Sequence, residues 1–498
     1  MTKFILINSG TQENRVAMLK DGKLEEFFIE RVNKRTIVGN IYKARIDSIA
    51  TSLNAAFVDI GLGKKGFLYL SQPAFGPEFN DDDVDNLTLA ASPQVKKNGR
   101  LNVGQEILVQ VVKEQFGTKG PRLTTKISLP GRYLVVIPYS NNIGISRRID
   151  EDAERKRLKD LMHSMRLPSD FGFVIRTVSV GTDKRQLHRD VKFLIKLWHR
   201  IAQISHRSKT PALIHEEFNL IMRIVRDSFT EDVTNIFIDS KRDFHAIRRF
   251  VRIYSPSLLR KVLFYRGKEP LFEKFKIEEK IDEIYERKVN LKSGGYLYIE
   301  PTEGLVAVDV NSGRFKGPTA ARGVKAQEEM AFKVNMEAAD EIARQLRLRD
   351  LGGLIVIDFI DMIKDVHRKR VFTHFKQLLK HDRAKTDVIR ISEFGILEMT
   401  RQKQRLSAEK VSFQICPYCE GRGRVRTVAT VAIAVLRMLN KVLKEQKKGK
   451  LLISLHPDVV EFLNLQYKDT LKDLQQRFKS SLILNPSPHL HLEKIIIE

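Results

Sequence analysis

Cysteine is nearly absent from this chain, because its 498 residues include only two, Cys416 and Cys419. A disulfide framework is therefore excluded, and the Cys-Pro-Tyr-Cys spacing indicates metal or redox chemistry. Long apolar runs are missing too. The longest, 428–436, falls well short of the ~20 residues of a membrane-spanning helix, and the N-terminal run is too short for a signal peptide. We therefore expect a cytoplasmic protein without a membrane span.

Negative charge is scarce: 61 acidic residues face 87 lysines and arginines, which gives a net charge of +26 and a pI near 9.8. Such an excess predicts a polyanionic partner, with nucleic acid the first candidate and an anionic membrane surface the second. Basic charge that serves solubility alone is the remaining alternative. The hydrophobic content of 42% excludes a disordered chain, and the length predicts about three or four domains.

Two apolar stretches, 305–313 and 354–362, are predicted strands that carry Asp309 and Asp358. A helix-like segment over 324–349 separates them, and strand–helix–strand units bring distant residues onto neighbouring strands. Alternation along a strand places Asp309 and Asn311 on one face. Neighbouring aspartates repel each other unless a cation lies between them. The sequence therefore predicts a magnesium site that activates water to cut a phosphodiester, assisted by Asn311.

Structural explanations for these residues stay open. Aspartates at strand ends also act as caps or pair with nearby arginines. Asp361 either orients the first two aspartates without binding the metal itself or caps the next helix. Arg344, Arg347 and Arg349 end the long helix, where cations offset the helix dipole without any phosphate ligand.

The N-terminal half has a different pattern. Residues 1–34 predict a three-stranded meander that pairs with strands later in the chain, within an α/β segment at 222–286. Residues 35–125 carry short strands punctuated by glycine, typical of a small OB-type barrel. Phe57, Phe67, Lys113 and Lys119 suit its nucleic-acid face, although both phenylalanines could equally belong to its core. A predicted strand over 172–178 carries Arg176 and Thr177.

The cysteine pair supplies only half of a structural zinc site, which requires four ligands. The nearest histidines are His381 and His456, neither of them close in sequence. A second copy of the pair from another subunit completes the site most simply and predicts a homodimer that shares one zinc ion. A redox pair and a half-site closed by distant histidines are the alternatives.

Several motifs together resemble the bacterial ribonuclease E/G family, nearly from end to end. They are Asn-Ile-Tyr-Lys at 40–43, Ala-Ala-Phe-Val-Asp at 55–59, Gly-Thr-Lys-Gly at 117–120, Leu-Thr-Thr at 123–125, Val-Asp-Val-Asn at 308–311, Arg-Gln-Leu-Arg-Leu-Arg at 344–349, 352–362 and 416–423. The wording at 57–62 and 292–297, and the lack of a disordered scaffold after the catalytic core, favour the shorter ribonuclease G branch.

The resemblance implies a single-strand-specific endoribonuclease that cuts A/U-rich RNA, leaves 5′-phosphate and 3′-hydroxyl ends, and acts in rRNA maturation and mRNA decay. The implied cofactors are magnesium, held by Asp309 and Asp358 with Asn311 assisting, and zinc, held by Cys416 and Cys419 and shared between subunits of a homodimer or tetramer. RNA-binding positions fall on Phe57, Phe67 and Lys119, with Lys113 close by. A pocket for a 5′-monophosphate falls on Gly131, Val135, Arg176, Thr177 and Lys385.

The implied fold class is α+β and multidomain. The expected domains are a split RNase H-like domain (1–34 and 222–286), an OB-fold domain (35–125), a 5′-sensor domain (126–221), a DNase I-like catalytic domain (287–411), a zinc link (412–425) and a small C-terminal α/β domain (426–498). Lys385 replaces an arginine of the E branch, which keeps the charge but loses the bidentate fork. A non-catalytic RNA-binding or ribosome-associated factor and a DNA nuclease are the competing hypotheses.

Overall fold

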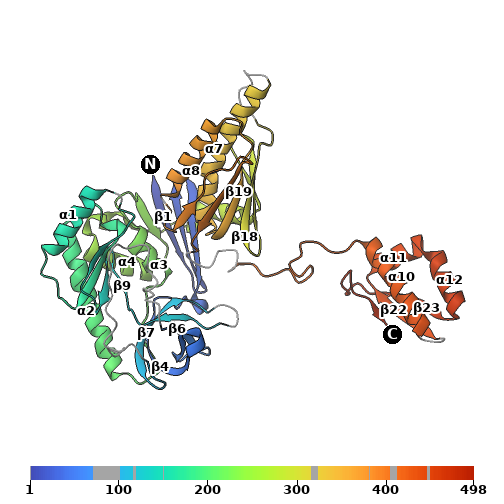
Figure 1. Cartoon of the computed structure of the whole chain (residues 1–498), viewed down its shortest axis with the longest axis horizontal. Helices are drawn as coiled ribbons and strands as arrows, with labels where there is room; N and C mark the ends of the chain where they lie inside the picture. Colours follow the sequence, from blue (N-terminus) through green and yellow to red (C-terminus); the bar gives the residue numbers. More distant parts are fainter. Residues whose placement is uncertain are drawn as a thin grey trace. The chain divides into compact units, whose positions relative to one another are not determined.

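The computed structural model describes residues 2–70, 101–115, 119–149, 151–315, 323–380, 382–403, 412–445 and 449–498. It divides into two compact units, unit 1 (Met1–Val411) and unit 2 (Ser412–Glu498), each coloured by sequence in Figure 1. Among the helices described, none is long and apolar enough to cross a membrane.

A discontinuous sheet in unit 1 joins the start of the chain to strands far along it. In spatial order it consists of β15 (Val262–Phe264), β14 (Asn235–Ile238), β1 (Lys3–Ser9), β2 (Glu13–Lys20) and β3 (Lys23–Arg31). β1 runs parallel to β14 with Ile5 opposite Ile236, which confirms the predicted pairing of the N-terminal meander with later strands. One face packs on α3 (Leu220–Ser228) and α4 (Lys241–Tyr254), the other on α5 (Leu271–Lys274) and α6 (Ile277–Tyr285).

The second sheet closes into a five-stranded, OB-like barrel, as the glycine-punctuated pattern predicted. Pairing of β4 with both β5 and β7 closes the ring, and β13 extends it beside β4. The strands are β4 (Ile41–Ala50), β5 (Ala55–Asp59), β6 (Gly66–Tyr69), β7 (Glu106–Lys113), β8 (Arg122–Thr124) and β13 (Ala212–His215).

A four-stranded sheet follows, covered by two helices. It contains β9 (Leu129–Pro130), β10 (Leu134–Pro138), β11 (Ile143–Ile145) and β12 (Phe171–Ile175), with α1 (Asp152–His163) and α2 (Lys184–Arg207). β12 ends at Ile175, earlier than the predicted strand over 172–178, because Thr177–Ser179 forms a 3-10 turn. Arg176 and Thr177 therefore lie just beyond the strand, so their side chains need not point to opposite faces of the sheet as neighbouring strand residues do.

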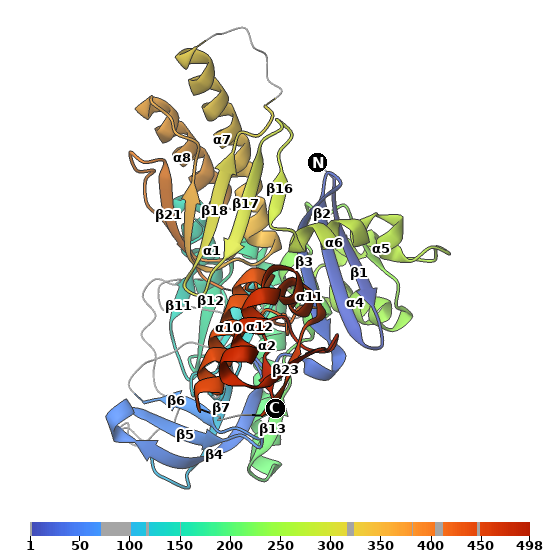
Figure 2. The same ribbon diagram turned by 90° about the vertical axis from the view of Figure 1, so that its right-hand side faces the viewer.

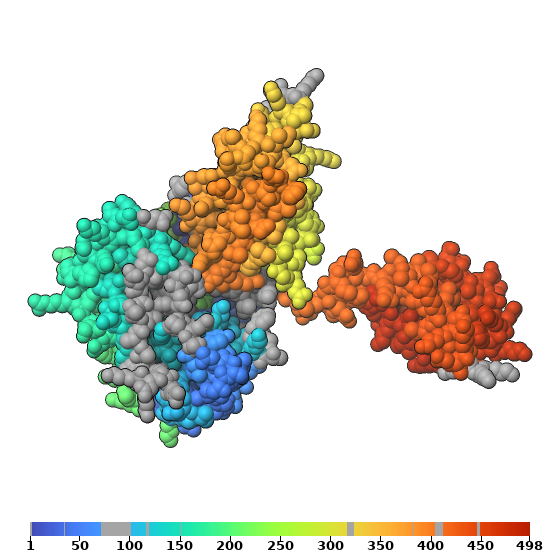
Figure 3. Space-filling model, in the orientation of Figure 1, coloured from blue at the N-terminus to red at the C-terminus, as the bar shows by residue number. Residues whose placement is uncertain are grey.

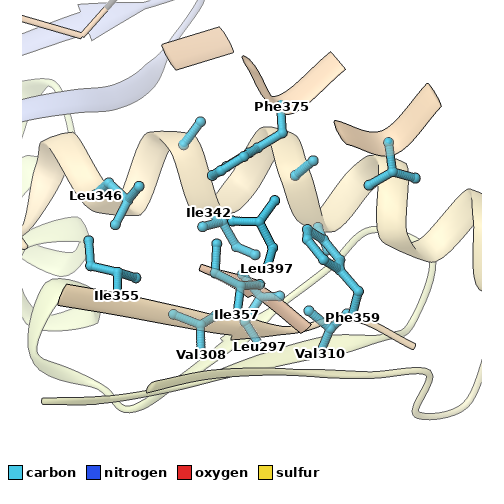
Figure 4. Close-up of a cluster of buried hydrophobic side chains, with 14 of the residues drawn as sticks. Leu297, Val308, Val310, Ile342, Leu346, Ile355, Ile357, Phe359, Phe375 and Leu397 are labelled. Atoms are coloured by element: carbon cyan, nitrogen blue, oxygen red, sulfur yellow. The ribbon is translucent and has the colours of Figure 1, made fainter. Parts of the chain in front are cut away.

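The carboxylate sheet, as we call the sheet that carries Asp309 and Asp358, has six strands. Their spatial order is β16 (Lys288–Asn290), β17 (Tyr296–Pro301), β18 (Leu305–Asn311), β19 (Gly353–Asp358), β21 (Ile396–Arg401) and β20 (Thr386–Val388). α7 (Val324–Leu348) and α8 (Asp365–Leu379) cover one face, and Figure 2 shows several strands of this sheet side by side. In Figure 4 the side chains of Val308, Val310 and Ile357 point toward α7. We call the opposite face, which packs against neither α7 nor α8, the open face.

The end of α7 attaches the carboxylate sheet to the discontinuous sheet. Arg344 donates to the carbonyl oxygen of Leu24 at 2.7 Å, and Arg347 pairs with Glu25 at 2.7 Å. Arg349 donates to the carbonyl oxygen of Glu286 at 2.7 Å. These arginines therefore act as structural contacts between modules of unit 1.

Unit 2 is a small α/β domain. A three-stranded sheet of β22 (Lys450–Leu455), β23 (Ser481–Pro486) and β24 (Ile496–Ile497) packs with α10 (Val428–Glu445), α11 (Pro457–Gln466) and α12 (Lys468–Phe478). β22 and β23 run parallel, as the crossover through α11 and α12 requires. Pro457 occupies the first turn of α11, where its missing N–H has no cost.

Candidate active site and nucleic-acid interface

Asp309 and Asp358 lie opposite each other on adjacent parallel strands, β18 and β19. Such strands are about 4.8 Å apart. Val308 and Val310, on either side of Asp309, are buried against α7. Alternation therefore turns both carboxylates to the open face, where both residues are exposed. The structure brings together the two residues that the sequence predicted as a pair.

Among the residues that the structure describes, the charged groups that shift the pKa of Asp358 are carboxylates. Burial, together with the carboxylates of Asp309 and Asp361, raises the pKa of Asp358. The Asn311 side-chain amide donates to Asp309 Oδ2 at 2.7 Å. The groups that shift the pKa of Asp358 include no arginine or lysine among the described residues. The alternative that this aspartate pairs with a nearby arginine is therefore not supported.

Two polar side chains of α7 fix the loop that follows β19. The Asn335 amide donates to the carbonyl oxygen of Ile360 at 2.7 Å and accepts the Ile360 N–H at 3.0 Å. Glu328, two turns earlier, accepts the N–H groups of Ile363 at 2.7 Å and Lys364 at 3.1 Å. Both side chains are buried, so the loop that carries Asp361 is anchored rather than free-standing.

Asp361 does not cap a helix, because α8 begins at Asp365 and its N-cap residue is Lys364. The capping alternative for Asp361 is therefore wrong. The Phe359 N–H donates to the carbonyl oxygen of Gly395 at 3.2 Å. Gly395 has φ +77°, and a Cβ there would lie 3.2 Å from Asp361 Oδ1, so this turn beside Asp361 requires glycine.

The donor set fits a hard cation. Carboxylate oxygens are the ligands that Mg²⁺ prefers, and Mg²⁺ commonly takes one or two protein carboxylates and fills its other positions with water and substrate oxygens. Over the described ranges, no cluster of three or more His, Cys, Asp or Glu side chains has the arrangement of a metal site. The in-register carboxylates of Asp309 and Asp358 are donors of the type that Mg²⁺ prefers.

The outside of the barrel carries a row of aromatic and basic side chains. Phe57 is in register with Phe67, Phe67 with Arg122, and Arg122 with Lys113. The two phenylalanine rings meet edge to face at 5.7 Å. Both are half-buried and lie outside the barrel core, so the explanation that they are core residues is wrong. Figure 3 shows barrel residues, in blue, at the surface of unit 1.

Tyr69 and Arg122 extend this row beyond the predicted residues. The Tyr69 ring lies 4.7 Å from that of Phe67, and the Arg122 guanidinium lies 4.9 Å from the Tyr69 ring. Lys119 is exposed and lies three residues before the start of β8. Accessible rings beside cations are what proteins use to stack bases and contact phosphates of single strands.

The Arg176 pocket, as we call the group of Gly131, Val135, Arg176 and Thr177, lies where the start of β10 meets the end of β12. Arg176 donates to the carbonyl oxygen of Gly131 at 2.6 Å. The Thr177 hydroxyl lies 3.3 Å from that of Ser146. Val135 is fully buried in β10, so its side chain contributes packing. The structure brings Arg176 and Gly131 into direct contact, as the resemblance implied for a shared pocket.

A buried carboxylate on α2 shapes the backbone of this pocket. Asp190 is fully buried and accepts the N–H groups of Arg132 at 3.3 Å, Tyr133 at 2.7 Å and Leu134 at 2.9 Å. Burial raises the pKa of Asp190. A Cβ at Gly131 would lie 2.5 Å from its oxygens, so the approach of chain to carboxylate demands glycine.

A second carboxylate, Asp227 on α3, holds the arginine itself. It pairs with Arg176 at 2.8 Å and with Arg226 at 2.9 Å. Burial acts to raise the pKa of Asp227, but the guanidinium groups of Arg176, Arg226 and Arg383 outweigh it and hold the pKa well below its usual range. Arg383 lies two residues before the half-buried Lys385.

Cys416 and Cys419 lie at the ends of a tight turn in unit 2. The backbone N–H groups of Cys419 and Tyr418, and the Cys419 thiol, lower the pKa of Cys416. Arg422 donates its N–H to the Cys419 carbonyl oxygen at 2.9 Å. A favoured thiolate suits zinc. The turn precedes α10, which starts only at Val428, unlike redox pairs activated at a helix N-terminus.

Sequence reasoning missed several of these residues. Tyr69 follows Phe67 by two positions on one strand, so alternation alone could have found it. Asp227, Asp190 and Arg383 reach the Arg176 pocket from other elements, and nothing in the local sequence marks them.

The barrel face, the carboxylate pair and the arginine pocket together define a multidomain protein equipped to handle a phosphate-bearing polymer. Residues 128–404 match the model of the ribonuclease E/G family, and residues 415–498 match the model described as RNase E/G, thioredoxin-like domain. The chain belongs to the ribonuclease E/G family. The second match includes both cysteines and the three-stranded sheet of unit 2.

Its similarity to ribonuclease G extends over more than nine-tenths of those relatives. Ribonuclease G from Escherichia coli (strain K12) is 38% identical, over 95% of each chain. Ribonuclease G from Haemophilus influenzae is 40% identical, over 92% of this chain and 91% of its own. Ribonuclease E from H. influenzae is 38% identical over 97% of this chain, but over only 51% of its own length.

Proposed function

We propose that this chain is a single-strand-specific endoribonuclease that cuts A/U-rich RNA and leaves 5′-phosphate and 3′-hydroxyl ends. The observation that carries the proposal is the in-register pair Asp309 and Asp358, exposed on the open face, where the carboxylates of Asp309 and Asp361 raise the pKa of Asp358. The names of the relatives, ribonuclease G and ribonuclease E, support the ribonuclease class. The cellular roles that follow are rRNA maturation and mRNA decay.

Asp309 and Asp358 would hold a magnesium ion. When bound, Mg²⁺ offers charge stabilisation at the phosphate and a lower pKa for a water molecule. Asn311 engages one oxygen of Asp309 at 2.7 Å, which orients this carboxylate and leaves its other oxygen available. Asp361, anchored beside Gly395, adds negative charge that strengthens the preference for a cation.

Substrate binding is assigned to two further surfaces of unit 1. On the barrel, bases stack on Phe57 and Phe67, and phosphates contact Lys113 and Lys119. Arg176 and Thr177 receive a 5′-monophosphate, since a guanidinium and a hydroxyl are suitable donors to phosphate oxygens. Gly131 and Val135 form the backbone of that pocket, and Lys385 supplies a further charge.

Cys416 and Cys419 would supply two thiolates to a structural zinc ion. Such zinc sites take four ligands, and the described parts of one chain hold no group of three or more His, Cys, Asp or Glu side chains arranged to bind a metal ion. A second copy of the pair completes the site, so the working unit is a homodimer, or a tetramer built from two such dimers.

The decisive experiment measures cleavage of one short single-stranded RNA, prepared with a 5′-phosphate or a 5′-hydroxyl, by wild type and Asp358→Asn. We expect magnesium-dependent cutting by wild type, faster with the 5′-phosphate, and a loss of about 1,000-fold in the variant, equivalent to about 4 kcal/mol. RNA binding should persist. Full activity in the variant would refute the metal site, and binding without cutting by wild type would favour a non-catalytic RNA-binding factor. Equal cutting of matched DNA would favour a DNA nuclease.

The zinc proposal has its own test. Replacing both cysteines, Cys416→Ser with Cys419→Ser, should abolish zinc binding and yield monomers, because serine hydroxyls are poor zinc ligands. Zinc content and particle mass by light scattering measure this directly. An intact zinc-free dimer in the variant would contradict the shared site.

A further inference from the structure

Two exposed aromatic residues, Tyr298 and Phe394, belong to the strand on one side of the carboxylate pair and to the turn before the strand on the other side. We propose that Tyr298 and Phe394 are stacking positions for the RNA bases on either side of the phosphate that is cut. This inference rests on the proposed function, because it assumes that RNA crosses the open face at Asp309 and Asp358. It assigns base contacts at the cut itself, separate from those on the barrel.

Tyr298 belongs to the same transverse row as the carboxylates. On β17 it is in register with Asp309 on β18, which is in register with Asp358 on β19. Leu297 and Ile299, on either side of it, are buried, so alternation turns the Tyr298 ring to the open face. The residue is 39% exposed. The strand that carries this ring therefore lies one strand spacing, about 4.8 Å, from the strand that carries Asp309.

Phe394 flanks the pair from the other side. Asp358 is in register with Ile396 on β21, and Phe394 lies in the tight turn just before that strand. Hydrogen bonds fix the turn: Gly395 N–H to the Ser392 carbonyl at 3.2 Å, Ser392 N–H to the Ile396 carbonyl at 2.9 Å, and Ile396 N–H to the Ser392 hydroxyl at 3.2 Å. The phenyl ring nevertheless makes little contact with the protein, since Phe394 is 80% exposed.

The neighbouring charges favour a nucleic acid as the occupant. Lys288 is opposite Tyr298 on β16, and Arg390, just before the turn of Phe394, is exposed. Cations beside exposed rings match the pairing of phosphate contact and base stacking in single-strand recognition. A single exposed apolar residue is ordinary on a protein surface. Here Tyr298 ends one side of the row that contains the carboxylate pair, and Phe394 lies in the turn two residues before Ile396, which ends the other side.

A fluorescent base tests the proposal. 2-Aminopurine is placed immediately 5′ or 3′ of the cleavage site of a short RNA, and its quenching by stacking is measured in an Asp358→Asn background, which prevents cutting. We expect quenching at one position to fall in Tyr298→Leu and at the other in Phe394→Leu. Tyr298→Phe and Phe394→Tyr keep a ring and are the matched controls, which should retain the quenching.

The same substitutions in the active enzyme should lower kcat/KM by about tenfold each, because base–aromatic stacking contributes about 1–3 kcal/mol and tenfold equals about 1.4 kcal/mol. Quenching and kcat/KM that are unchanged in both leucine variants would overturn the proposal. A change of particle mass in Phe394→Leu with quenching intact would overturn it in favour of a subunit contact. Quenching that depends on both rings, combined with a wild type that never cuts RNA, would instead refute the proposed function and leave Tyr298 and Phe394 as base-stacking positions beside the carboxylate pair.

Discussion

The carboxylate sheet and the Arg176 pocket treat charge in opposite ways. On the open face, Asp358 has two other carboxylates as its charged neighbours, and its pKa is raised. In the pocket, Arg176 already has an anionic partner, Asp227, at 2.8 Å, and the pKa of that carboxylate is held low. One site carries unbalanced charge, while the other is balanced before any ligand arrives.

The difference separates two ways of binding a charged ligand. Unbalanced like charges cost stability in the free protein, and a cation relieves that cost on binding. A balanced pair stabilises the protein and fixes the guanidinium, so a phosphate must share Arg176 with Asp227 or displace that carboxylate. We therefore expect strong cation dependence at the first site and modest 5′-phosphate selectivity at the second.

The largest contrast is expected from Asp309→Asn. Cleavage should fall by about 1,000-fold, whereas the free energy of unfolding without magnesium should stay equal or rise by less than about 1 kcal/mol, since like charges are removed. Urea denaturation with and without Mg²⁺ measures the change in stability. Magnesium should raise the free energy of unfolding of wild type but not of the variant. A variant clearly less stable than wild type in EDTA would show that Asp309 is structural.

Asp227→Asn is expected to change the free energy of unfolding in the opposite direction, with a smaller effect on cleavage than Asp309→Asn. Removing the partner of Arg176 and Arg226 should lower the free energy of unfolding by about 2–3 kcal/mol at pH 7. The folded pKa of Asp227 is depressed, so its stabilisation is present above its unfolded pKa of about 3.9 and is lost as pH falls through the folded value.

Urea denaturation at several pH values tests this sign. The gap between wild type and Asp227→Asn should narrow as pH drops below about 4. Asp227→Glu, which keeps the charge, is the matched control and should lose less stability. An equal gap at all pH values would mean that the carboxylate charge of Asp227 does not stabilise the fold. Preference for 5′-phosphorylated RNA should change in the variant while cleavage of 5′-hydroxyl RNA is retained.

The sequence predicted what depends on local pattern. Alternation and strand–helix–strand order predicted that Asp309 and Asp358 share one face, and the register confirms it. Glycine-punctuated strands predicted the closed barrel. The resemblance supplied the identity of the Arg176 pocket, because no periodicity marks Arg176 as a binding residue.

What local pattern could not predict depends on tertiary packing. Asp190 on α2 and Asp227 on α3 reach the same arginine pocket from separate helices. The choice for Asp361 between a capping and a supporting role depended on where α8 begins, and helix boundaries are poorly determined by sequence. From the sequence, the arginines at the end of α7 could be explained by the helix dipole alone. The sequence did not indicate the contacts that they make with Leu24 and Glu25.

The discontinuous sheet has a consequence for biosynthesis. β1 needs β14 as its parallel neighbour, and β14 emerges from the ribosome only after the barrel and the four-stranded sheet. At roughly 5–20 residues of synthesis per second, β1 to β3 are exposed for tens of seconds before β14 is made. During that time the edge of β1 is unpaired, and unpaired strand edges promote aggregation. The inserted modules can complete their own local contacts in that interval. Nascent chains truncated before β14 should therefore depend most on chaperones.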